Sequence, residues 1–217
     1  MVASRTLTSP PSLSPFPSLS SNLPRSSIHS IAGDGDCGLC LEKGADGIVA
    51  ALSSQIAPLA EGGDIIAAIL ALAEQIEIHM DGTSGALYSI FFNGLASGLR
   101  SAAEKLSSDV ATSEVWAEAL SQAKATLYQY TRARTPSHTL VDPLEAFVTA
   151  FAANPSDFAG AVKKGVEGAA ETVNYTAKAG RAAYVGREAL AKAAVPDPGA
   201  HGVSVLLEGI LKVVGGK

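Results

Sequence analysis

The stretch Ala32-Gly33-Asp34-Gly35-Asp36-Cys37-Gly38 places two carboxylates two residues apart in a segment that contains three glycines. Neighbouring carboxylates repel each other unless a positive group lies between them. Mg²⁺ prefers carboxylate oxygens and usually shares its remaining sites with phosphates and water. The stretch therefore predicts either a Mg²⁺ site with Asp34 and Asp36 as ligands or a solvated turn, since Asp and Gly are also ordinary turn residues.

Other loops with a similar pattern fit this stretch less well. The glycines have the spacing of a dinucleotide-binding loop, but that loop follows a strand and brings the backbone close to a pyrophosphate, which Asp34 and Asp36 would repel. An EF-hand loop beginning at Asp34 would need an acid where Ala45 stands. Cys37-x-x-Cys40 lacks both the second ligand pair of a zinc site and the βαβ context of a redox motif. A Mg²⁺ site remains the preferred metal hypothesis.

Downstream of this stretch, apolar residues recur at helical spacing almost throughout. We predict an all-α protein with seven helices, over residues 39–57, 64–78, 84–106, 113–134, 143–153, 156–191 (with a break near Gly180) and 200–214. Asp142 before Pro143 indicates a helix start with Asp as the N-cap and Pro as the first helical residue. Nothing in the pattern supports a sheet.

Composition and charge exclude several classes of protein. A chain of 217 residues with 47% hydrophobic residues can bury a sizeable core. The net charge of −5 and the lack of a Lys/Arg cluster argue against a nucleic-acid surface. No apolar run reaches the roughly 18 residues that a membrane-spanning helix needs. Two cysteines do not make a disulfide scaffold, so we expect a reducing compartment, the cytoplasm.

Residues 1–30 differ from the rest of the chain. They contain five prolines among many serines, and no acidic residue precedes Asp34. Proline at this density is incompatible with a regular helix, so we predict a disordered leader over residues 1–30 and one folded domain over residues 31–217. Two alternatives stay open: an organelle transit peptide, which Arg5 and Arg25 would suit, and a misassigned start of the coding sequence.

Two further stretches add chemistry to the first. Met80-Asp81-Gly82-Thr83-Ser84-Gly85-Ala86-Leu87-Tyr88 places a hydroxyl pair at the predicted start of a long helix, where free backbone amides favour anions. Lys178–Tyr184 is followed by Val195-Pro196-Asp197-Pro198-Gly199-Ala200. In this order the three stretches resemble the DhaL, or nucleotide-binding, domain of the dihydroxyacetone kinases, in particular the C-terminal domain of the single-chain ATP-dependent enzymes. The resemblance runs from about Ile31 to the end of the chain.

This resemblance implies a fold, a ligand and a set of contacts. The family fold is a ring of eight antiparallel helices that binds ATP or ADP with Mg²⁺ at one end. By resemblance, Asp34 and Asp36 hold Mg²⁺. The implied nucleotide contacts are Cys37, Gly38, Leu39, Cys40, Thr83, Ser84, Thr139, Leu140, Arg181, Asp197, Pro198 and Gly199. Thr83 and Ser84 would also serve as a plain helix cap, and Thr139 and Leu140 as a plain interhelical loop.

The sequence departs from the family in two places. The first of three metal-binding aspartates falls where this chain has His29, and imidazole is a poor ligand for Mg²⁺. The family's first helix falls on the Ser/Pro-rich leader, so we expect an open ring with an uncovered apolar wall that allows a homo-oligomer. We interpret the scattered His79, His138 and His201 as structural rather than catalytic residues.

The resemblance also implies a partner. In the family, a separate domain called DhaK binds dihydroxyacetone, and the chain has no length for it. We therefore expect a subunit or fragment of a dihydroxyacetone (glycerone) kinase that transfers phosphate only when combined with a DhaK-type domain. The alternative is a degenerate, non-catalytic nucleotide-binding or interaction module, which His29 favours.

Overall fold

A computed structural model describes residues 36–55, 64–108, 110–184 and 194–215, and these residues form helices and connecting turns with no strand. The α-helices are α2 (Cys37–Ser53), α3 (Ile65–His79), α4 (Gly82–Leu106), α5 (Ser113–Tyr130), α6 (Val141–Ala153), α7 (Phe158–Glu171) and α9 (Pro198–Gly215). Two 3₁₀ turns, η1 (Thr172–Asn174) and η2 (Arg181–Tyr184), lie between α7 and α9. The predicted all-α class is confirmed. The predicted leader and missing first helix lie outside the described residues.

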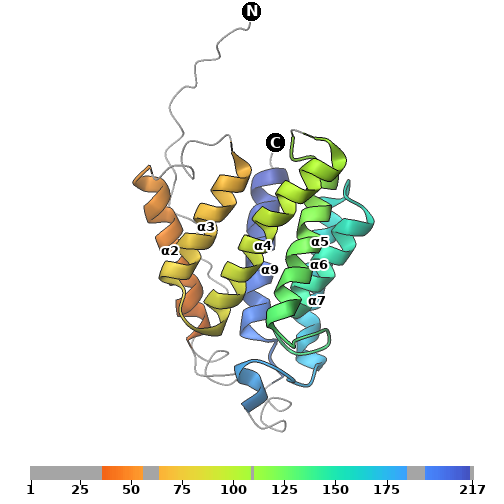
Figure 1. Cartoon of the computed structure of the whole chain (residues 1–217). Helices are drawn as coiled ribbons and strands as arrows, with labels where there is room; N and C mark the ends of the chain where they lie inside the picture. Colours follow the sequence, from red (N-terminus) through yellow and green to blue (C-terminus); the bar gives the residue numbers. More distant parts are fainter. Residues whose placement is uncertain (1–35, 56–63, 109, 185–193, 216–217) are drawn as a thin grey trace, which may run out of the picture.

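The helices pack in chain order to form a ring. Figure 1 shows them side by side, with the first residues of α2, α4 and α9 at the same end, the lower end in that view. Each helix packs on the next along the chain, and α9 packs on α7 and α6 and also contacts α2. No described helix is long and apolar enough to span a membrane.

The contact between α9 and α2 differs from the open ring that we expected. Gly202 of α9 approaches Leu41 of α2 so closely that an added Cβ would lie 2.5 Å from the Leu41 Cδ1 atom. A glycine therefore lets the last helix meet the first described one, and the ring closes at this level.

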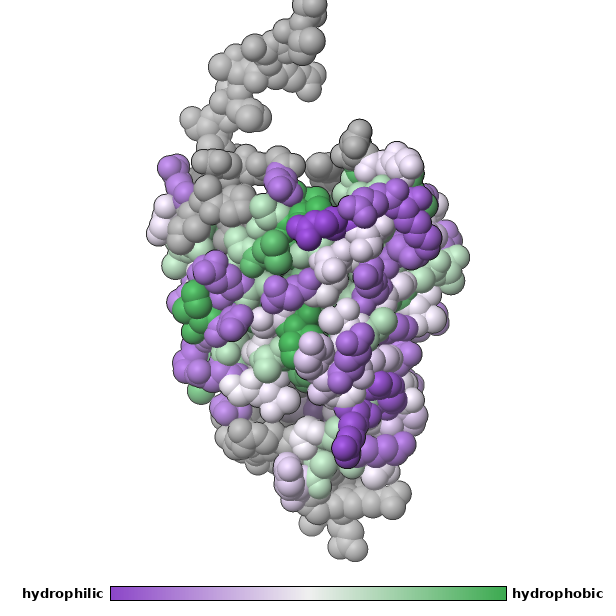
Figure 2. Space-filling model, viewed as in Figure 1, coloured by the Kyte–Doolittle hydropathy of each residue, from purple (hydrophilic) through white to green (hydrophobic). Residues whose placement is uncertain are grey.

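Apolar side chains nevertheless remain exposed on the ring. On α9, Leu206, Ile210 and Val213 recur at helical spacing and are exposed, and α3 exposes Leu70 and Ile78. Figure 2 shows apolar side chains over α3 and beside α4, between polar ones. Exposed apolar side chains are thus present on described helices, while the uncovered wall and the homo-oligomer stay predictions.

The predicted helix over residues 156–191 is wrong in its second half. Helix α7 ends at Glu171, the turn η1 follows, and Tyr175 is extended. The reason is tertiary: Thr172 is fully buried, and its hydroxyl donates a hydrogen bond to the Ala169 carbonyl at 2.6 Å. The same hydroxyl oxygen accepts a hydrogen bond from the Asp197 amide, a contact that fixes where the helix ends.

The ends of α5 and α6 also differ from the predicted ones. Helix α5 ends at Tyr130 instead of Arg134, because the Arg134 guanidinium folds back and donates hydrogen bonds to the carbonyls of Tyr128, Thr131 and Ala133. Helix α6 begins at Val141, so Asp142 lies inside the first turn and is not the N-cap. Its carboxylate instead accepts hydrogen bonds from the preceding loop.

The start of α4 depends on a glycine, and this gives a stability prediction. A Cβ at Gly85 would overlap the Met80 carbonyl oxygen, a backbone atom that cannot rotate away. We expect Gly85→Ala to lower the free energy of unfolding by about 3 kcal/mol through this overlap. The matched control is Gly209→Ala on α9, where a Cβ meets nothing within 4 Å.

Because alanine favours a helix more than glycine does, the control should raise the free energy of unfolding by about 1 kcal/mol. Urea denaturation of both variants measures the difference. Equal effects of the two substitutions would contradict the proposed overlap.

Candidate functional site

A cavity of about 630 Å³ opens at the end of the ring where α2, α4 and α9 begin. Five segments line it: the N-terminal parts of α2 and α4, the loop before α6, the stretch around Gly180, and the turn that leads into α9. The residues predicted from the sequence that line this cavity are Asp36, Cys37, Leu39, Cys40, Thr83, Ser84, Thr139, Leu140, Asp197, Pro198 and Gly199. The ring thus brings together segments that are more than a hundred residues apart.

Three predicted site residues are not placed at the cavity by the described part of the structure. Gly38 belongs to the first turn of α2 without lining the cavity, and Arg181 is the first residue of η2. Asp34 falls outside the described residues. The roles given to these three residues therefore stay predictions.

The cavity also includes residues that the sequence analysis missed. One group is mainly apolar and lies at the ends of loops and helices: Leu87, Thr131, Ala133, Val141, Ala179, Gly180 and Ala182. Leu87 lies in the Met80–Tyr88 stretch, and Ala179, Gly180 and Ala182 lie in the Lys178–Tyr184 stretch, so these motifs could have revealed them. Nothing in the local sequence marks the other three. A second group is charged and consists of Glu42, Lys43, Asp46 and Asp81. Lys43 follows Cys40 by three residues on α2, a spacing that could have revealed it.

The first turn of α2 is tied to the turn before α4. The Cys40 thiol donates a hydrogen bond to the Asp81 carbonyl at 3.2 Å, and the Lys43 ammonium group pairs with the Asp81 carboxylate at 3.2 Å. Asp36, the residue before α2, is exposed and its carboxylate makes no capping hydrogen bond. This arrangement leaves the Asp36 carboxylate free to bind a ligand in the cavity.

Charge at the cavity is predominantly negative. Among the described lining residues, carboxylates stand at positions 36, 42, 46, 81 and 197, against the single ammonium group of Lys43. Phosphates would be repelled here unless a cation came with them. Within the described part of the chain, no three His, Cys, Asp or Glu side chains are grouped closely enough to hold a metal ion. Asp36 suits a Mg²⁺ ion that takes one or two protein carboxylates and completes its shell with phosphate and water.

The two cysteines keep their protons at neutral pH. Burial raises the pKa of Cys37 to about 11, with Asp197 adding to the effect, and burial also raises the pKa of Cys40. A protonated thiol is a poor nucleophile and a poor metal ligand. This agrees with the sequence-based rejection of a zinc or redox role for the pair.

Thr83 and Ser84 lie in the first turn of α4. Asp81, the residue before this helix, makes no capping hydrogen bond with its side chain. The first backbone amides of a helix need acceptors from outside it, and the helix dipole favours an anion there. The two hydroxyls and these amides together can bind a phosphate group.

A buried carboxylate holds the loop before α6. Asp142 is 1% exposed and accepts hydrogen bonds from the backbone amides of Ser137 at 3.0 Å and Thr139 at 2.7 Å. The hydroxyl of Thr139 also accepts a hydrogen bond from the Val141 amide at 3.2 Å. Thr139 and Leu140 are therefore presented to the cavity by a rigid turn.

The turn that leads into α9 forms the opposite wall. The Asp197 amide donates to the Thr172 hydroxyl at 2.9 Å, and the Asp197 carboxylate accepts from the Ala200 amide at 2.8 Å. Gly199 packs against Leu140, where an added Cβ would lie 3.3 Å from the Leu140 Cβ atom. The two walls therefore touch at Leu140 and Gly199.

Burial raises the pKa of the Asp197 carboxyl from 3.8 to about 6, and the amides of Ala200 and Gly199 offset part of this shift. Since the folded pKa is raised, the folded chain binds the proton more tightly than the unfolded chain does. Ionisation of Asp197 therefore lowers the free energy of unfolding as the pH rises through the window from about 4 to about 6.

This shift gives a pH prediction. Asp197→Asn keeps an oxygen that accepts from the Ala200 amide but cannot ionise. Relative to the wild type, we expect the variant to gain about 2 kcal/mol of stability between pH 4 and pH 7. Urea denaturation at several pH values measures the difference between the two chains. Parallel stability curves would contradict the raised pKa.

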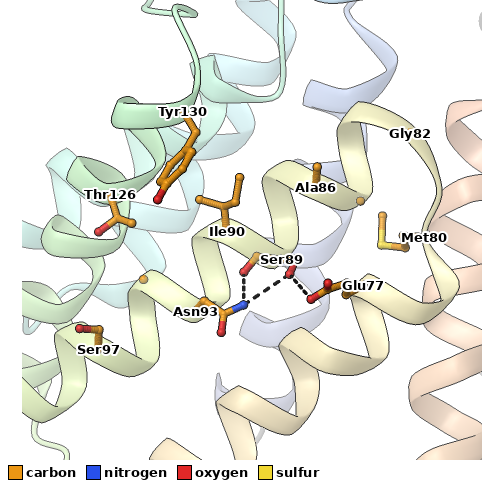
Figure 3. Close-up of a pocket in the computed structure, with 12 residues that line it drawn as sticks. Glu77, Met80, Gly82, Ala86, Ser89, Ile90, Asn93, Ser97, Thr126 and Tyr130 are labelled. Carbon is orange, nitrogen blue, oxygen red and sulfur yellow. Dashed lines mark hydrogen bonds between the residues drawn. The ribbon is translucent and has the colours of Figure 1, made fainter.

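A second cavity, of about 640 Å³, lies between α3, α4 and α5 (Figure 3). Three of its polar residues are bonded to one another: the Ser89 hydroxyl donates to the Glu77 carboxylate at 3.4 Å, and the Asn93 amide donates to the Ser89 carbonyl at 2.9 Å. None of the site residues predicted from the sequence lines it. The cavity at the start of α2 and α4 is therefore the candidate site.

Comparison with known proteins shows the family of the chain. A sequence model described as the DAK2 domain matches residues 31–212. The chain is 39% identical to a dihydroxyacetone kinase of Pichia angusta over 183 residues, which cover 82% of this chain and 30% of the relative. It is 30% identical to the mouse triokinase/FMN cyclase over 190 residues, which cover 84% of this chain and 30% of the relative.

A solved structure has the same fold. The dihydroxyacetone kinase of C. freundii, in complex with AMP-PNP and Mg²⁺, aligns with a TM-score of 0.62 at 23% sequence identity. The alignment covers 87% of this chain and 30% of that one. The chain thus spans about 30% of the length of the relatives that it matches.

Proposed function

Since the chain belongs to the DAK2 domain family of the dihydroxyacetone kinases, we propose that its cavity binds ATP or ADP together with Mg²⁺. The observation that carries the proposal is the assembly of five segments, far apart in the sequence, around one cavity of about 630 Å³. The sequence motifs in these segments resemble those of a nucleotide-binding domain. The related C. freundii kinase is described with AMP-PNP and Mg²⁺.

In this proposal each wall of the cavity has its own task. Asp36, together with Asp34, holds Mg²⁺, which neutralises charge on the phosphates. Thr83, Ser84 and the first amides of α4 bind phosphate oxygens. Cys37, Gly38, Leu39 and Cys40 contact the nucleotide from the first turn of α2. The base lies against Thr139 and Leu140, and Arg181 and the Asp197-Pro198-Gly199 turn close the site.

The net negative charge of the cavity supports the role of the metal. A nucleotide brings several negative charges to a surface where carboxylates outnumber the ammonium group of Lys43 among the described lining residues. Coulomb repulsion at such short range is large unless divalent cations come with the nucleotide. The proposal therefore requires nucleotide binding to depend on Mg²⁺.

We further propose that the chain acts as the nucleotide half of a dihydroxyacetone kinase. In phosphoryl transfer the protein mainly positions the reactants and stabilises charge, and both tasks need a second site that presents the acceptor hydroxyl. A DhaK-type substrate-binding domain, as a separate subunit or in the same chain, would supply that site. The alternative is a non-catalytic nucleotide-binding module, which the replacement of a metal-binding aspartate by His29 favours.

Titration calorimetry tests nucleotide binding directly. We expect the chain to bind ADP in the presence of Mg²⁺ and to lose most of its affinity in EDTA. Equal affinity with and without Mg²⁺ would remove the metal bridge from the proposal. No binding of ADP or ATP under either condition would overturn the proposal.

A further inference from the structure

His138 combines deep burial with an unusual backbone conformation. It lies in the loop between α5 and α6, one residue before Thr139, and is 2% exposed. Its φ angle is 57°, in the left-handed region that residues other than glycine seldom adopt. Such a conformation persists only where the surrounding structure fixes it, and it occurs often beside functional sites.

One hydrogen bond connects this histidine to the end of α7. The Nδ1 atom of His138 lies 2.6 Å from the Thr172 carbonyl oxygen. A carbonyl only accepts hydrogen bonds, so Nδ1 carries the proton and donates it. Thr172 is fully buried, and its hydroxyl oxygen accepts a hydrogen bond from the Asp197 amide at 2.9 Å. Thr172, the first residue of η1, is therefore bonded to both walls of the candidate site.

The rest of the imidazole has no competing anchor. Its Nε2 atom is buried and has no hydrogen-bond partner among the described residues. The ring lies close enough to the Asp197 carboxylate to lower its pKa, which opposes the effect of burial. Among the described residues, the bond from Nδ1 to Thr172 is thus the hydrogen bond that holds the ring.

We propose that His138 is a positioning residue that, through Thr172, sets the distance between the Thr139–Leu140 turn and the Asp197–Gly199 turn. The inference rests on the proposed function, in which these two turns enclose the nucleotide. His138 does not line the cavity, so it acts through its neighbours and not by touching the ligand. A small displacement of either turn lowers the affinity for a ligand, because hydrogen bonds and packing contacts with the ligand form only over short distances.

Two substitutions of His138 distinguish a role in positioning the two turns from a role in merely filling space in the core. In His138→Asn, the side-chain amide takes the place of Nδ1 and donates to Thr172, and asparagine tolerates the left-handed backbone. In His138→Gln, the side-chain amide nitrogen lies where Nε2 lies in the wild type. The Thr172 carbonyl therefore loses the hydrogen bond that residue 138 donates. The controls are His201→Asn at an exposed position of α9 and Val148→Ala in the buried core.

The readout is affinity for Mg²⁺-ADP, measured by calorimetry on the full chain alongside the melting temperature. We expect His138→Gln to weaken binding by about tenfold, while His138→Asn stays within about threefold of the wild type. His201→Asn should leave affinity unchanged. Val148→Ala should lower the melting temperature without a matching loss of affinity.

Hydrogen exchange adds a measurement that needs no nucleotide. The Asp197 amide should exchange faster in His138→Gln than in His138→Asn, because its acceptor on Thr172 is less firmly held. The proposal is overturned if His138→Gln binds Mg²⁺-ADP like the wild type, if asparagine fails to restore binding, or if Val148→Ala weakens binding equally. A wild-type chain that binds no nucleotide would overturn the proposed function instead, and equal exchange at Asp197 would then overturn the link itself.

Discussion

We expect the isolated chain to leave dihydroxyacetone unphosphorylated, and the chain mixed with a DhaK-type substrate-binding domain to release ADP in a dihydroxyacetone-dependent reaction. The cavity at the start of α2 and α4 has walls for a nucleotide, but the proposal assigns the acceptor hydroxyl to another domain. Without a positioned acceptor the reaction loses its effective-molarity advantage, so the second domain should raise turnover by at least about 10³-fold. A coupled assay for ADP release measures this.

The same assay tests the position of His29. Two divalent ions held close together need anionic ligands to offset their mutual repulsion, and a neutral imidazole removes one negative charge from that set. We therefore expect His29→Asp to raise the turnover of the mixture further, and to change nothing when the second domain is absent. Rapid dihydroxyacetone-dependent turnover by the unmodified chain alone would contradict both parts of this prediction.

Asp36→Asn should produce the second large effect. Its carboxylate lines the cavity, is exposed and makes no capping bond, so it can give its full charge to a metal ion. Asparagine keeps the size but removes the charge. We expect the affinity for Mg²⁺-ADP to fall by about 100-fold, while the weak affinity expected in EDTA does not fall, because without a metal the lost charge only reduces repulsion.

Asp46→Asn provides the matched control for Asp36. Asp46 also lies on α2, also lines the cavity and also carries a negative charge, but it lies outside the predicted metal loop. If Asp36 acts only through the negative electrostatic potential of the cavity, both substitutions should raise the affinity for Mg²⁺-ADP by similar factors. A loss confined to Asp36→Asn, and present only with Mg²⁺, identifies a metal ligand. Equal changes in both variants would contradict that role.

Local sequence was enough to predict the fold class and most of the cavity. Helical periodicity predicted α2, α3, α4 and α9 to within a few residues, because each of these helices buries one face of its own sequence. The motifs around Asp36, Thr83 and Asp197 predicted residues that the ring then brought to one cavity. Those motifs are short and contiguous, so their chemistry can be seen without knowing the fold.

Other features depend on contacts between residues that are distant in the sequence. The bond from His138 to Thr172 joins residues that are 34 positions apart, and the bond from Asp197 to Thr172 joins residues that are 25 positions apart. The end of α7 at Glu171 depends on the second of these bonds. The raised pKa of Asp197 arises from burial, which the sequence around it does not reveal. By itself, the sequence predicted most of the helices and the segments that we propose to bind metal and phosphate. Only the tertiary structure decided where α7 stops, which histidine is buried and how the cavity walls are held, because desolvation and long-range hydrogen bonds exist only once the helices have packed.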